Sequence, residues 1–308
     1  MILEMPNTST NDVAKKIVEI RESGGAVSLG RVLTLVVCAE HGGPTESAIE
    51  AAVGASREHP SRVIVLSRRA NGDESKLDAE IRVGGDAGAS EVVILYLYGE
   101  LANHPHSVVT PFLLPDTPVV TWWPGVAPVN PSIDPLGKIG RRRILDATRS
   151  QNPSTVLARR LETYAPGDTD LAWTQITHWR AILTSALDRP PHLPFVSVQV
   201  SGPHDSPSLD LLAGWLRAQL KVPTTRVYGS FEVRVDREDG PVVLAVDENN
   251  NAVLSAPGKP DGRVAMTRRD LPVLISEELR RLDTDEVYAD ALAGVTEVEY
   301  AADTQVAS

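Results

Sequence analysis

The tryptophans are the residues of this sequence best suited to bind a partner. The motif TWWPG contains Trp122 and Trp123, and the motif DLAWTQITHWR contains Trp173 and Trp179. Large aromatic side chains dominate the binding energy of protein interfaces. Trp122 and Trp123 are adjacent at the end of an apolar run, so on a strand they must point to opposite faces. We expect one of them in the core and the other exposed or covered by another element.

The second motif lies in a segment, residues 168–188, that we expect to form one long helix. At helical spacing Trp173, Ile176 and Arg180 share one stripe, and Ile176 also lines up with Trp179. A broadly apolar helix with a basic edge suits burial between two domains or between two chains. Both interpretations stay open: an interface inside the molecule and a surface for a partner protein.

Three consecutive arginines, Arg141 to Arg143, form the densest basic cluster. On a strand, Arg141 and Arg143 would lie on one face and Arg142 on the other. Guanidinium groups suit carboxylate or phosphate partners. The alternative is a solvated strand edge whose charges prevent pairing with another sheet. The candidate residues of a partner or domain interface are therefore Trp122, Trp123, Arg141, Arg143, Trp173, Trp179 and Arg180.

Signatures of catalysis and phosphate binding are missing from the sequence. It contains no GxxxxGK[ST], no GxGxxG after the first strand, no GxSxG and no HExxH. HGGP (41–44) opens a helix, but Glu46 in its first turn would repel a phosphate, so we interpret it as a structural turn. We interpret GGDAG (84–88) as a turn too. We predict no catalytic residue, no cofactor and no metal ligand, and hence no enzyme.

The histidines and the single cysteine fit structural roles. His104 and His106 flank a proline and cannot share a helical face, so we interpret them as surface residues rather than metal ligands. Cys38 lies in the apolar run VLTLVVCA, where a buried thiol is inert. One cysteine excludes an internal disulfide and an all-cysteine metal site, and it fits a reducing compartment.

The pattern of apolar runs predicts the fold. Continuous apolar segments at 32–39, 62–67 and 91–98 are typical of strands buried on both faces of a parallel sheet. A second β-α-β unit begins at 194–202, and alternating residues over 231–255 indicate hairpins. We predict an α/β protein of two α/β domains. The first has a largely parallel sheet flanked by helices, and the second adds an antiparallel hairpin region.

The segment YAPGD (164–168) is the best candidate for a linker between these domains. It divides the chain into an N-terminal domain over 1–165 and a C-terminal domain over 166–308, which ends in two helices. Between 124 and 135 four prolines interrupt any regular pattern, which predicts a long loop. Long loops in compact domains are often functional.

Composition and charge narrow the class of protein. The 308 residues carry a net charge of −11, which argues against general binding of nucleic acid. The apolar runs have the length of strands, far short of a membrane span. The start MILEMPNTST has neither the basic nor the apolar region of a signal peptide. We therefore expect a cytoplasmic protein that contacts neither nucleic acid nor membrane.

The chain resembles a known family in several segments. ESGGAVSLGRVLTLVV, TPVVTWWPG and DLAWTQITHWRAIL are together similar to the OpcA family, the glucose-6-phosphate dehydrogenase assembly proteins of actinobacteria and cyanobacteria. The resemblance runs from about Met1 to about Leu292. With GRVLTLVV and the loop PVNPSIDPLG, the chain is similar to the actinobacterial form.

This resemblance implies a non-enzymatic partner of glucose-6-phosphate dehydrogenase, the enzyme that opens the oxidative pentose phosphate pathway. Family members promote the active oligomer of the dehydrogenase and raise its apparent substrate affinity, which makes them allosteric activators. In some relatives cysteines relay control by thioredoxin. Here Cys38 has no second cysteine, which rules out an intramolecular thiol switch.

One alternative is an α/β enzyme or sensor for a sugar phosphate or a nucleotide. Its basis is the pair of β-α-β units with glycine- or proline-bearing turns, and the missing phosphate loops count against it. A third hypothesis joins the two, with a metabolite held by the turns at 41–45 or 203–208 that tunes partner binding. The sequence leaves self-association open.

Overall fold

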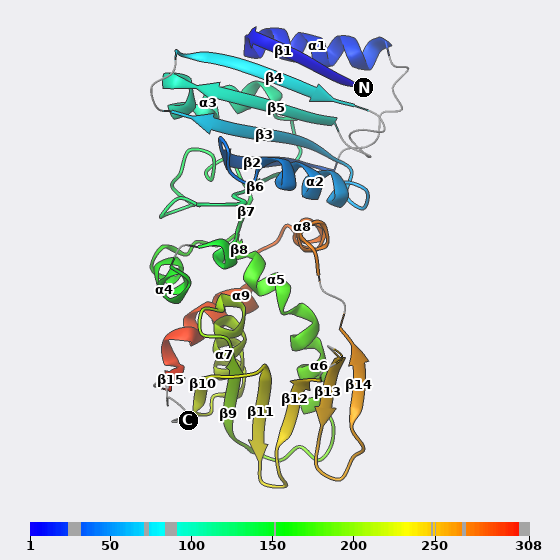
Figure 1. Cartoon of the computed structure of the whole chain (residues 1–308), viewed down its shortest axis with the longest axis vertical. Coiled ribbons are helices and arrows are strands. Elements are labelled where there is room, and N and C mark those ends of the chain that lie inside the picture. Colours follow the sequence, from blue (N-terminus) through cyan, green and yellow to red (C-terminus); the bar gives the residue numbers. More distant parts are fainter. Residues whose placement is uncertain are drawn as a thin grey trace. The chain divides into compact units, whose positions relative to one another are not determined.

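The chain folds into two compact α/β units. The computed structural model describes residues 1–23, 32–70, 74–83, 91–150, 152–247, 249, 251–266 and 269–301 (Figure 1). Unit 1 consists of Met1–Arg149, Ala165–Thr169 and Asp270–Thr284, and unit 2 consists of Ser150–Tyr164, Asp170–Arg269 and Asp285–Ser308. Because both units are assembled from three segments, the chain passes between them repeatedly. The single boundary between 165 and 166 stays a prediction.

Unit 1 is built on a sheet with the order β1-β4-β5-β3-β2-β6-β7-β8. Its strands are β1 (Ile2–Thr8), β2 (Leu33–Glu40), β3 (Ser61–Arg69), β4 (Lys76–Arg82), β5 (Glu91–Tyr98), β6 (Val119–Trp122), β7 (Arg142–Leu145) and β8 (Asp168–Asp170). The neighbours from β5 through β7 pair in parallel, while β4 runs antiparallel to β5 and β1 to β4. The apolar runs therefore form a largely parallel sheet, as predicted.

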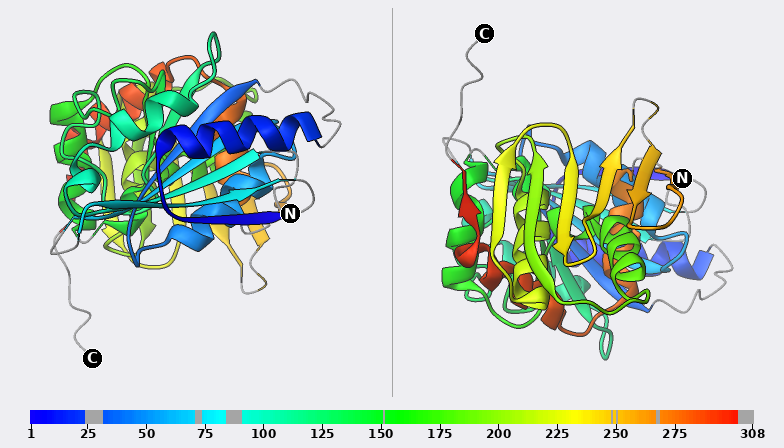
Figure 2. Two further views of the ribbon diagram at one scale, coloured as in Figure 1. Left: turned by 90° about the horizontal axis from the view of Figure 1, so that it is seen from above. Right: turned by 90° about the horizontal axis from the view of Figure 1, so that it is seen from below.

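Helices flank this sheet. They are α1 (Thr10–Ser23), α2 (Thr45–Ala55), α3 (Pro105–Val109) and α8 (Leu271–Arg280), with 3-10 turns η2 (Gly99–Asn103), η3 (Thr110–Phe112) and η4 (Ala147–Arg149). Val13 and Ile17 of α1 join Phe112 and alternate strand residues in one hydrophobic core, and Figure 2 shows α1 lying across the strands. α2 contacts β2 and β3, and α8 contacts α2.

Unit 2 is built on a sheet with the order β14-β13-β12-β11-β9-β10-β15 (Figure 2). The strands are β9 (Phe195–Gly202), β10 (Thr224–Tyr228), β11 (Glu232–Arg237), β12 (Val242–Val246), β13 (Asn251–Ser255), β14 (Gly262–Ala265) and β15 (Glu299–Tyr300). β9, β10 and β15 pair in parallel, and β11 to β14 add an antiparallel meander to β9. Both the second β-α-β unit and the hairpin region are confirmed.

The helices of unit 2 are α4 (Pro153–Thr163), α5 (Leu171–Gln175), α6 (Thr177–Leu187), α7 (Pro207–Leu220) and α9 (Glu286–Gly294), followed by the 3-10 turn η5 (Val295–Glu297). α7 contacts β9, β10 and α9. It crosses α9 at a pair of glycines: a Cβ built on Gly214 would lie 2.3 Å from the carbonyl oxygen of Ala291. A Cβ on Gly294 would lie 2.2 Å from the carbonyl oxygen of Gly214. The close crossing therefore requires residues without side chains.

The prediction of one helix over 168–188 is wrong. Asp168–Asp170 form β8, and the helical segment breaks at Ile176, whose φ of −94° and ψ of 8° lie outside the helical range. The carbonyl oxygen of Thr174 accepts from the hydroxyl of Thr177 at 2.9 Å and from the guanidinium of Arg269. These side-chain bonds add to the backbone N–H that the same carbonyl accepts at the end of α5.

Three single segments complete the comparison with the predicted fold. In the segment 164–168 the Asp168 side chain is 4% exposed and forms an ion pair with Arg143. The chain changes from unit 2 to unit 1 between Tyr164 and Ala165, and the role of 164–168 as a linker stays a prediction. β1 was not predicted, although it pairs with β4 along the edge of the sheet. The turn expected at 84–88 lies outside the described residues.

Candidate functional site

The TWWPG motif lies at the end of β6, and both its indoles are buried. Trp122 is 0% and Trp123 1% exposed. Trp123 belongs to the core that includes Phe112 of η3, while Trp122 is no part of that core, as expected for neighbours on opposite faces. Trp123 continues the strand pairing by donating its backbone N–H to the carbonyl oxygen of Ile144 at 3.1 Å. The two indoles therefore fix the start of the proline-rich loop.

The loop that follows, residues 124–135, has no helix or strand, as predicted, but its far end is held by side chains. Asp134 accepts the backbone N–H of Leu136 at 2.9 Å, and Leu136 is 1% exposed. The loop presents three apolar side chains to solvent: Val126, Val129 and Ile133 are 74%, 78% and 63% exposed. Apolar groups held outward on an ordered loop are typical of an interaction surface.

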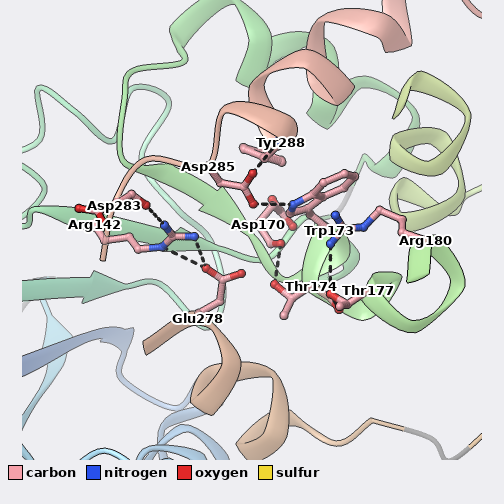
Figure 3. A network of polar contacts seen from close by, with 10 residues as sticks. All are labelled: Arg142, Asp170, Trp173, Thr174, Thr177, Arg180, Glu278, Asp283, Asp285 and Tyr288. Atoms are coloured by element: carbon pink, nitrogen blue, oxygen red, sulfur yellow. Dashed lines mark hydrogen bonds and ion pairs between the residues drawn. The ribbon is translucent and has the colours of Figure 1, made fainter. Parts of the chain in front are cut away.

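The arginine cluster is mostly internal to unit 1. Arg142 donates from Nε and Nη2 to Oε2 of Glu278 at 3.1 and 2.7 Å, and from Nη1 to the carbonyl oxygen of Asp283 at 2.5 Å (Figure 3). Arg143 forms an ion pair with Asp168 and donates to the carbonyl oxygen of Pro166 at 2.6 Å. Arg142 and Arg143 are buried, so neither belongs to a solvated strand edge.

Arg141 behaves differently from the other two arginines. Its side chain is 61% exposed and pairs with Asp283 at 2.9 Å. Arg141 bonds the Asp283 carboxylate, whereas Arg143 bonds Asp168, and β7 itself begins only at Arg142. That Arg141 and Arg143 share one face of a strand stays a prediction.

In unit 2, the DLAWTQITHWR motif builds an aromatic cluster (Figure 3). Nε1 of Trp173 donates to Oδ2 of Asp285 at 2.9 Å, and the ring of Tyr288 lies 6.0 Å away. The guanidinium carbon of Arg180 lies 3.5 Å from the Trp173 ring centroid, a cation–π contact. Trp173 and Arg180 therefore share one stripe, as predicted, even though the helix breaks between them.

Trp179 packs separately from Trp173. Its ring centroid lies 4.3 Å from that of Phe231, which precedes β11. Trp179 and Arg180 are half-buried, whereas Trp173 is 1% exposed. Each indole of the motif thus has an aromatic neighbour within unit 2. A role of the seven candidate residues in joining domains or contacting a partner stays a prediction.

Sequence reasoning missed the acidic partners of these clusters. Asp285 lies 112 residues from Trp173, and Glu278 lies 136 residues from Arg142. Both lie in the C-terminal part of the chain, where the sequence alone gives no sign of these partners. The one local signal is Asp285 just before a helical segment, where it accepts the backbone N–H of Tyr288 as an N-cap.

Side chains that could hold a metal ion are scattered over the described residues. Among them no three His, Cys, Asp or Glu side chains come together as a metal site. Cys38 is buried, and burial raises the pKa of its thiol above the ordinary range, which agrees with an inert core cysteine. HGGP is a turn in which Gly42 has a φ of +78°. No helix of the described part is long and apolar enough to cross a membrane.

Fold and side chains together define a two-unit α/β protein whose aromatic and basic residues are engaged in internal networks. Comparison with known families identifies it further. The models of two family domains, described as the N-terminal and the C-terminal domain of a "Glucose-6-phosphate dehydrogenase subunit", match residues 52–162 and residues 166–292 respectively. The chain belongs to the OpcA family of glucose-6-phosphate dehydrogenase assembly proteins. No curated protein matches it significantly.

Proposed function

We propose that this chain is a non-catalytic cytoplasmic protein that binds glucose-6-phosphate dehydrogenase, promotes its active oligomer and raises its apparent substrate affinity. Membership of the OpcA family carries this proposal. Activation requires that the chain bind the active state of the enzyme more tightly than the inactive one. A tenfold shift in that equilibrium corresponds to about 1.4 kcal/mol of differential binding.

The proline-rich loop at 124–135 is the surface that we assign to the dehydrogenase. It lies within the residues matched by the N-terminal family model. Its exposed Val126, Val129 and Ile133 offer apolar area, and its prolines and the Asp134 bonds reduce the entropy lost on binding. Of the seven candidate residues, Trp122 and Trp123 support this surface from the core rather than forming it.

The decisive experiment mixes the purified chain with purified dehydrogenase. It measures substrate-saturation curves and the mass of the complex. The expected result is a lower half-saturation concentration together with a larger oligomer. No shift in either quantity would refute the proposed function.

A matched pair of variants tests the loop. Val129→Asp places a charge in the proposed contact and should weaken activation about tenfold or more. Val264→Asp changes the same residue type at a 46% exposed position on β14 in unit 2, and should leave activation unchanged. Equal activation by the wild type and Val129→Asp would exclude the loop while leaving family function intact.

A further inference from the structure

A pocket of about 400 Å³ opens in unit 2, next to the end of β9 and the start of α7. In α/β sheets, ligands bind beyond the carboxyl ends of parallel strands, and this volume is within the range of small-molecule sites. The lining residues are Leu157, Ala158 and Leu161 of α4, His204 and Asp205 after β9, Asp210 of α7, Leu292 of α9, and Val295, Thr296, Val298 and Tyr300. The apolar lining residues come mainly from α4, α9 and the segment after α9. The two aspartates come from the loop after β9 and from α7.

Asp210 gives the pocket its chemical character. It is 6% exposed, and its Oδ1 accepts a hydrogen bond from Nε of Arg226 at 3.1 Å. No described group bonds to its Oδ2. Buried carboxylate oxygens normally accept hydrogen bonds. The Oδ2 atom of Asp210 can therefore accept one from a ligand in the pocket.

Arg226 supplies no free cation to the pocket. Besides Asp210, its guanidinium donates from Nη1 to the carbonyl oxygens of Gly202 and Val227 at 3.3 and 2.7 Å. Nη2 donates to the carbonyl oxygen of Pro203. All three guanidinium nitrogens are therefore engaged, and the residue is 4% exposed. The ionisable lining residues are two aspartates, one histidine and one tyrosine, with neither lysine nor arginine, which disfavours a phosphate or another anion.

Two further observations favour a cation. Burial raises the pKa of Asp210 to about 6 although Arg226 opposes the shift, so one guanidinium does not fully offset the lost solvation of the carboxylate. The ring of His204, which lines the pocket, stacks on that of Tyr228 with centroids 4.9 Å apart, and Tyr228 is 68% exposed. An aromatic face beside carboxylates suits a positively charged group.

We propose that this pocket binds a small organic cation, with its apolar body against Leu157, Leu161 and Leu292 and its ammonium group bonded to Oδ2 of Asp210. The pocket belongs to unit 2, whereas the proline-rich loop that we assign to the dehydrogenase belongs to unit 1. The pocket includes His204 and Asp205 of the turn at 203–208, one of the two turns in the hypothesis of a metabolite that tunes partner binding. The chemistry selects an amine rather than a sugar phosphate.

The test is calorimetric titration of the full purified chain, without dehydrogenase, at pH 7.5. The probe is 2-phenylethylammonium, and its controls are the neutral 2-phenylethanol, the anionic 3-phenylpropionate and inorganic phosphate. The ammonium compound should bind at least tenfold more tightly than each control. Failure of the ammonium compound to bind below about 10 mM, or tighter binding of any control, would overturn the proposal.

Two variants locate the binding. Asp210→Asn removes the charge and should weaken binding of the ammonium compound about tenfold or more. Because that change also disturbs Arg226, a second variant, Ala158→Trp, fills the pocket from an exposed helix position. Arg159→Trp alters the neighbouring exposed residue, which does not line the pocket, and should bind as the wild type does. Unchanged affinity in Ala158→Trp would place the ligand elsewhere and refute the site.

Discussion

The carboxylate of Asp285 accepts a hydrogen bond from Nε1 of Trp173 at 2.9 Å, and so joins two helices of unit 2 that lie 112 residues apart in sequence. Its other oxygen accepts the backbone N–H of Tyr288 at 2.9 Å and caps α9. One side chain thus determines both where α9 begins and where the indole lies. The cation–π contact of Arg180 depends on the same ring position.

Asp285→Ala should therefore destabilise unit 2 beyond the loss of a helix cap. The cap contributes about 1 kcal/mol, and a buried indole N–H left without an acceptor costs about 1–3 kcal/mol more. Urea unfolding followed by tryptophan fluorescence measures the change. The control is Asp283→Ala, because the Asp283 side chain is 91% exposed and its bond to Arg142 comes from the backbone. Similar losses in both variants would contradict the role given to Asp285.

The buried pair of Arg142 and Glu278 allows a sharper test. Both side chains are nearly inaccessible, at 4% and 6% exposure. Removing one partner leaves an uncompensated charge, so Arg142→Met and Glu278→Leu should each lower the free energy of unfolding by about 3–5 kcal/mol. The double variant should regain most of that loss, because neither charge remains buried alone. Additive losses in a double-mutant cycle would show that the two residues do not act as a pair.

The contrast between these clusters and the strands shows what the sequence can predict. β2 and β3 follow from their own composition, because a strand buried on both faces must be apolar throughout. β1 was not predicted because it lies at a sheet edge, where its residues are only half-buried or exposed and show no continuous apolar run. At the break near Ile176 the carbonyl oxygen of Thr174 accepts from Arg269, and Arg142 pairs with Glu278 of α8. No local pattern encodes such distant contacts, so the apolar fold was predictable and the polar partners were not.

The glycine crossing of α7 and α9 predicts a steric effect. Gly214→Ala would place a methyl group 2.3 Å from the carbonyl oxygen of Ala291, so the helices must separate. The expected cost is about 2–3 kcal/mol, as for other overpacked sites. Gly262→Ala is the control, since its nearest neighbour would lie 3.9 Å away. Thermal unfolding should show a clear drop in Tm for Gly214→Ala only; equal Tm values would mean that the helices do not meet this closely.

The last prediction concerns pH. The ionisable groups around Asp210 are Arg226 of β10, His204 and Asp205 of the loop after β9, and Tyr300 of β15. Burial is the largest cause of the rise of the Asp210 pKa to about 6. In the unfolded chain an aspartate titrates near 3.9. The folded state therefore binds the proton more tightly, and the contribution of this group to stability grows as the pH falls through 6 and is lost as the pH rises.

When the pH falls from 7.5 to 5, protonation of Asp210 should raise the free energy of unfolding by about 1 kcal/mol. The wild type should gain that much unfolding free energy relative to Asp210→Asn, which cannot titrate at this position. Asp205→Asn, which alters an exposed carboxylate at the same pocket, should follow the wild-type curve closely. Urea unfolding at both pH values measures the difference, and parallel curves for the wild type and Asp210→Asn would show that Asp210 titrates normally. A cation bound at Oδ2 should reduce the gain, because it favours the ionised carboxylate and lowers the pKa.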